Sequence, residues 1–62
     1  MGVKVEHEKQ KKLFKEAVES MISELRVRLI YFTKLYDETH EEIYKRQIWR
    51  IEQKIKILEE LL

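Results

Sequence analysis

Few side chains in this sequence have the chemistry and spacing of a catalytic or metal site. The two histidines, His7 and His40, are far apart in the chain, and there is no Cys to supply a thiolate ligand. Asp37 precedes His40 by three residues, as in the carboxylate and histidine elements of bundle metal sites, but such sites need further carboxylates in the bundle core. We expect the Glu residues to face solvent, so the sequence predicts no metal site and no cofactor.

Nucleophilic catalysis has equally little support. Ser20 and Ser23 have no histidine at a spacing that would activate them, and a chain whose single Gly is Gly2 has no Gly-rich phosphate loop. We therefore predict no catalytic residues, no enzymatic activity and no small-molecule substrate.

A basic row beside an aromatic residue is the strongest chemical feature. Arg46, Arg50 and Lys54 repeat every four residues along about 12 Å of a helix, with Trp49 next to them. Such a row can bind phosphates while the indole stacks on a base. Nucleic-acid binding through Arg46, Trp49, Arg50 and Lys54 is therefore the alternative function.

The same charges have a second interpretation, as a solvated helix face. A Glu four residues before a Lys or Arg stabilises an exposed helix. The sequence pI of about 8.0 is also below the value of about 9 that is usual for nucleic-acid-binding domains. The pairs in question are Glu24 with Arg28, Glu41 with Lys45, Glu42 with Arg46, and Glu52 with Lys56.

The composition is that of one small helical domain. The chain has 62 residues, no Pro and 40% charged residues, mostly Lys and Glu, a bias also reported for thermophilic proteins. No apolar run approaches the roughly 18 to 20 residues of a membrane span, and the N-terminus lacks the apolar segment of a signal peptide. We expect a soluble, cytoplasmic protein that has no membrane partner.

Two apolar stripes at helical spacing predict the elements that carry these side chains. The first eight residues lack this period, so residues 1–7 are interpreted as a flexible tail, with a short strand over 3–5 as the alternative. The first stripe consists of Phe14, Val18, Met21, Leu25, Leu29, Phe32 and Tyr36, with Ile22 beside it, and the second of Tyr44, Ile48, Ile51, Ile55, Leu58 and Leu62.

The phase of the stripes predicts a break between the two helices. A straight continuation from Tyr36 would place polar residues on the apolar face, and Thr39 with Glu42 forms a capping-box pattern. Asp37 is the competing N-cap. We predict helices over about 8–36 and 40–61, joined by a turn over about 37–39. A turn this short gives an antiparallel helical hairpin, which places the chain in the all-α class.

More apolar side chains are present than two stripes account for. Seven of the ten residues from Val27 to Tyr36 are apolar and point to every side of a helix. A second copy of the chain is the simplest surface to cover them, because two hairpins related by a two-fold axis form a four-helix bundle. Scattered surface apolar residues are the alternative explanation. The predicted homodimer interface consists of Val27, Ile30, Tyr31, Leu35, Ile43, Ile57 and Leu61.

Resemblances to known families agree with a helical hairpin. Leu25-Arg26-x-x-Leu29 and Arg46-x-Ile48-x-Arg50-Ile51 together resemble the helical-hairpin protein of the large ribosomal subunit over about half the chain. The strong basicity and small-residue turn of that family are missing here. In length and inferred architecture, the chain also resembles the plasmid copy-number regulator Rop, a hairpin dimer that binds paired RNA loops. No functional residue is carried over from either family, so the sequence favours a non-catalytic interaction or assembly module.

Overall fold

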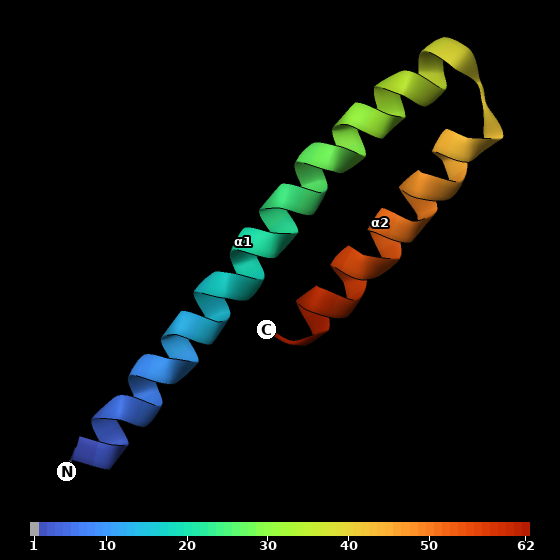
Figure 1. The fold of residues 1–62 in the computed structure, drawn as a ribbon. Helices are drawn as coiled ribbons and strands as arrows, with labels where there is room; N and C mark the ends of the chain where they lie inside the picture. The colour runs from blue at the N-terminus through green and yellow to red at the C-terminus, as the bar shows by residue number, and fades with distance from the viewer. Residues whose placement is uncertain (1) are drawn as a thin grey trace.

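Two antiparallel helices joined by a tight turn make up the computed structural model (Figure 1). It describes the backbone of residues 2–62 and the side chains of residues 9–62. Helix α1 spans Gly2–Thr39 and helix α2 spans Glu42–Glu60. The predicted all-α hairpin is therefore confirmed. The chain measures 58 × 15 × 11 Å, a length set by α1 alone at about 1.5 Å per residue.

Helix α1 begins earlier than the sequence pattern indicated. It starts at Gly2 and not near residue 8, so residues 3–5 are helical and do not form a strand. From Gly2 onward, the segment interpreted as a tail is part of α1, and Met1 lies outside the described residues. The physical reason is that residues 3–8 contain no Pro or Gly and include Lys and Glu, which favour helix. The N-terminal turns of α1 extend past the end of α2 (Figure 1).

The turn lies later than predicted, at residues 40–41 in place of 37–39. His40 has a positive φ of 56°, and its N–H donates to the Tyr36 carbonyl at 2.7 Å. This is the left-handed helix C-cap, which usually uses Gly. The Tyr36 and His40 rings pack edge to face with their centroids 5.7 Å apart, the side-chain contact that accompanies this cap. Histidine is one of the residues that tolerate this conformation better than most.

The predicted N-cap at Thr39 is wrong, and so is its competitor Asp37. Both residues lie within α1, and the N-cap of α2 is Glu41, which makes no side-chain capping bond. The Thr39 hydroxyl donates back to the Leu35 carbonyl at 2.8 Å and accepts the Glu41 N–H at 3.3 Å. Because Thr39 ends α1 and bonds within it, its hydroxyl stabilises the chain reversal and does not cap α2.

Relief of the left-handed backbone at His40 should stabilise the hairpin. A β-carbon in this conformation costs roughly 1 to 2 kcal/mol, so we expect His40→Gly to raise the unfolding free energy by about 0.5 kcal/mol after the loss of the Tyr36 contact and the extra chain entropy of Gly. Urea denaturation measures this change. The matched control is Lys34→Gly inside α1, which should cost about 1 kcal/mol. Equal losses in both variants would contradict the left-handed turn.

The core lies where the two stripes face each other, and it is small. Among the described side chains, Val18, Ile22 and Ile51 are buried, with 3%, 6% and 6% of their surface exposed. The Phe32 and Tyr44 rings pack across the helices with their centroids 6.2 Å apart. The half-buried members of the stripes are Leu25, Leu29, Phe32, Tyr36, Tyr44, Ile48, Ile55 and Leu58.

Three residues that the stripes placed in the core are exposed: Phe14, Met21 and Leu62. Leu62 follows the end of α2, and Phe14 of α1 lies beside this chain end. Neither side chain is therefore covered on all sides. Met21 lies about 60° around α1 from Val18, at the edge of the contact between the helices. Periodicity alone does not show how far α2 reaches along α1.

Candidate interaction surface

One side of the hairpin carries a groove that runs between the two helices. Its first section has a volume of about 310 Å³ and its second about 430 Å³. The sections adjoin, because Leu25 and Lys54 line both. We call this side the groove face. The first section is also lined by Met21, Glu24, Ile57 and Leu58, and the second by Arg28, Tyr31, Phe32, Gln47, Arg50 and Ile51.

The groove face is apolar toward its ends and charged in its middle. Met21 and Ile57 lie at one end, and Tyr31 lies toward the other. Between them, Glu24 and Arg28 form an ion pair along α1 at 3.9 Å, with both side chains exposed. The α2 side of the middle contributes positive charge through Arg50 and Lys54. The face therefore combines exposed apolar surface with a charge pattern that differs between its two helices.

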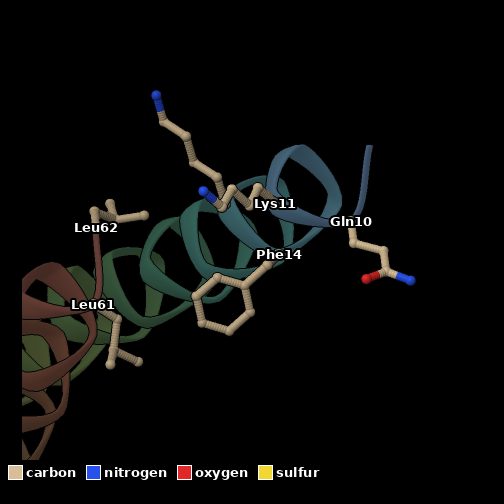
Figure 2. A pocket seen from close by; sticks show the side chains of 6 residues that line it. Gln10, Lys11, Phe14, Leu61 and Leu62 are labelled. Atoms are coloured by element: carbon tan, nitrogen blue, oxygen red, sulfur yellow. The ribbon is translucent and has the colours of Figure 1, made fainter. Parts of the chain in front are cut away.

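A third cavity lies at the open end of the hairpin. It has a volume of about 440 Å³ and is lined by Phe14 and Lys11 from α1 and by Leu61 and Leu62 from the chain end. Figure 2 shows the Phe14 ring and the Leu61 side chain extending on the same side of the helices. Phe14 and Leu61 are both exposed, so this end of the molecule also has exposed apolar surface.

The opposite side of the hairpin carries several polar side chains together with the apolar Ile22 and Leu62. Arg26 donates to the Glu59 carboxylate at 3.1 Å across the two helices, and Glu19 and Ser23 lie along the same side. Both members of the Arg26–Glu59 pair are about half exposed or more, so the pair contributes at most about 1 kcal/mol to stability. The groove face carries the exposed apolar side chains of Met21, Tyr31 and Ile57, and other exposed apolar side chains lie away from it.

The structure places the seven predicted interface residues as follows. Tyr31 and Ile57 line the groove, and Leu61 lines the end cavity. By helical spacing, Leu35 and Ile43 lie on the same face, Leu35 half-buried and Ile43 exposed. The remaining two, Val27 and Ile30, are exposed but lie elsewhere.

Val27 and Ile30 point away from the groove face. At about 100° per residue, Val27 is on the side of α1 opposite the buried Val18, and Ile30 is turned toward the Arg26 side. Sequence reasoning missed four other exposed apolar residues: Leu13, Phe14, Met21 and Leu62. Their exposure depends on where α2 ends and how it packs, which the stripe pattern does not reveal.

The four residues predicted to contact nucleic acid are divided between two places. Arg46, Trp49 and Arg50 line one cavity of about 390 Å³ on the outer side of α2, together with Lys45 and Glu42. Lys54 lies instead in the groove. Trp49 is 63% exposed, so its indole is available for stacking, whereas the Glu42 carboxylate reduces the positive charge of the cavity.

One of the four predicted ion pairs forms. Glu24 and Arg28 lie within 3.9 Å, and Lys15 with Glu19 makes a further pair at 4.0 Å that was not predicted. Among side chains 9–62, the predicted pairs Glu41–Lys45, Glu42–Arg46 and Glu52–Lys56 are not within 4.0 Å. These residues are exposed, where the free energy gained by pairing is small and their side chains remain in water.

The described side chains contain no cluster of three metal-ligating groups. Neither helix, over the part of the chain described, has a stretch long and apolar enough to cross a membrane. Comparison of the chain with protein families, with curated proteins and with solved structures gives no match.

Proposed function

We propose that the chain is a non-catalytic interaction module that associates with a second copy of itself through the groove face, forming a four-helix bundle. The two hairpins would supply each other with the apolar surface that each lacks. A stable protein interface needs about 800 Å² from each partner. One chain exposes 5639 Å² in all, and exposed apolar side chains lie on the groove face and at the end cavity.

The observation that supports this proposal is the imbalance between buried and exposed apolar side chains. Three hydrophobic residues are buried, whereas eleven large ones are exposed among the described side chains. Single exposed apolar residues are ordinary, but contiguous patches mark interaction sites. Here Met21, Ile57 and Tyr31 follow one groove, and Phe14 and Leu61 extend its end.

Sedimentation equilibrium over a dilution series tests the proposal. The expected result at micromolar concentration is a molar mass twice the 7.7 kDa of the chain, with dissociation at lower concentration. A mass of one chain at every concentration would contradict self-association. A mass of four chains would keep self-association and replace the two-hairpin bundle by a larger assembly.

A second candidate function is nucleic-acid binding on the outer side of α2. It is supported by the single cavity that joins Arg46, Arg50 and the exposed Trp49. This surface is distinct from the groove, apart from Arg50, so the two functions are compatible in one dimer.

Gel-shift titration at low and moderate salt tests this second function. If the cavity binds single-stranded DNA or RNA, Trp49→Ala should weaken binding by about tenfold or more, since stacking contributes roughly 1 to 3 kcal/mol per base. Arg46→Ala should make the slope of the logarithm of the binding constant against the logarithm of salt concentration shallower, by the amount expected for about one lost phosphate contact. Lys34→Ala, on α1, is the control with the same charge change as Arg46→Ala. No retarded band at low salt, or equal effects of Lys34→Ala and Arg46→Ala, would exclude the cavity as the site.

A further inference from the structure

The geometry points to a specific pairing of the two copies: α1 packs against α1 of the second copy, antiparallel, with the two-fold axis near residue 26. In this register Glu24 of each chain faces Arg28 of the other. The inference rests on the proposed self-association and adds the orientation and register of the partner.

A continuous seam along α1 is the first observation. Its positions follow steps of three and four residues, the spacing of a helix-packing seam. Six of its side chains are exposed and one, Leu35, is half-buried, so the seam is open to a partner. Only its two central positions are charged, and they have opposite signs. We call this set the α1 seam: Phe14, Ala17, Met21, Glu24, Arg28, Tyr31 and Leu35.

Charge complementarity selects one register among those that keep the seams in contact. With the axis near residue 26, Glu24 meets Arg28 of the second copy. The same register sets Met21 against Tyr31 and Ala17 against Leu35, so these apolar side chains meet apolar ones, while Phe14 at the end of the seam lies opposite Glu38. A shift by one heptad in either direction instead places Glu24 against Met21 or Leu35, and leaves every charge in the seam facing an apolar side chain.

The parallel arrangement of the two α1 helices is disfavoured by the same charges. It would set Glu24 against Glu24 and Arg28 against Arg28 of the second copy. Like charges repel each other, and here the layer of two Glu24 side chains would lie next to the layer of two Arg28 side chains.

Packing of α1 against α2 of the second copy is also disfavoured. Arg28 and Arg50 line the same section of the groove, so they lie at about the same level along the hairpin. A dimer in which α1 packs against α2 of the second copy has its two-fold axis parallel to the helices. That axis keeps both copies at the same level, so the two arginines of each chain would form one layer of four guanidinium groups. The antiparallel pairing of α1 with α1 avoids this layer, because it brings Glu24 to the level of Arg28.

The α2 helices then belong at the rim of the interface and not in its middle. If α2 instead contacted α2 of the second copy around the two-fold axis near residue 26, Arg50 would face Lys54 of the second copy. These side chains are exposed and long enough to remain in water while their aliphatic stems cover the rim. Ile43 and Leu61, near the two ends of α2, can still add apolar contact.

Disulfide cross-linking tests the register directly, because the natural chain contains no Cys. In the inferred register, Met21 lies beside Tyr31 of the second copy, whereas the two Met21 residues are about 15 Å apart along the helices. A disulfide requires Cα atoms within about 7 Å. We therefore mix Met21→Cys chains with Tyr31→Cys chains, oxidise them, and identify the products by mass spectrometry.

The expected product is the mixed disulfide, formed roughly tenfold more than either homodisulfide. Lys34→Cys, whose position lies off the seam, reports random collision. Rapid formation of the Met21→Cys homodisulfide would overturn the antiparallel pairing. No cross-link above the Lys34→Cys background, in a protein that sediments as a dimer, would overturn the register and leave the proposed function standing. A protein that sediments as a monomer would overturn both.

Discussion

An Ile51→Ala variant should lose about 2 to 5 kcal/mol of unfolding free energy, as is typical when a buried Ile is truncated. Ile51 is 6% exposed and is the only buried residue of α2. It is one of only three buried side chains among residues 9–62, so its truncation leaves a cavity that few neighbours can fill. For a domain this small, such a loss approaches its whole stability. Urea denaturation followed by circular dichroism measures it.

Trp49→Ala is the matched control for Ile51→Ala. It removes a larger side chain from the same helix, two residues away, but Trp49 is exposed. We expect a change within about 0.5 kcal/mol, as for surface substitutions in general. A loss as large as that of Ile51→Ala would show that α2 packs with a different face toward α1.

Tyr31→Glu should convert the proposed dimer largely to monomer. Tyr31 lies in the α1 seam and lines the groove, and each proposed dimer would contain two copies of the substitution. A buried carboxylate against apolar side chains without a partner costs several kcal/mol. We expect the dissociation constant to rise by at least about a hundredfold, or about 2.7 kcal/mol, with a lower melting temperature. Analytical ultracentrifugation measures the constant.

Lys34→Glu is the control for Tyr31→Glu, because it introduces the same carboxylate three residues away and off the seam. It should leave the dissociation constant within a few-fold of the parent. Ile57→Lys provides a second disruption from α2, at the end of the groove. If Tyr31→Glu and Ile57→Lys both sediment and melt like the parent, neither residue is buried between chains.

The hairpin itself follows from the sequence, because two stripes at helical spacing with different phases require two helices that face each other. The position of the turn does not follow. The pattern Thr39 with Glu42 is the same whether the Thr hydroxyl caps the next helix or, as here, bonds back to the Leu35 carbonyl. A left-handed His40 is also hard to foresee, since Gly normally marks such a position.

The candidate surface was predictable in part. An excess of apolar residues over two stripes identifies side chains such as Tyr31 and Ile57, which do line the groove. It does not say which side of the hairpin each one occupies, and Ile30 proves to point toward the Arg26 side. That assignment depends on the rotation of α1 against α2, which is set by the burial of Val18, Ile22 and Ile51.

Thermal unfolding at chain concentrations spanning a thousandfold tests the central claim most directly, namely that one hairpin needs a second to cover its apolar surface. If folding and association are coupled, dilution by this factor removes about 4.1 kcal/mol of stability. For two chains of this length, the melting temperature should then fall by roughly 15 °C. A melting temperature that does not change with concentration would contradict the claim, because it would mean that the single hairpin is stable with its groove face in water.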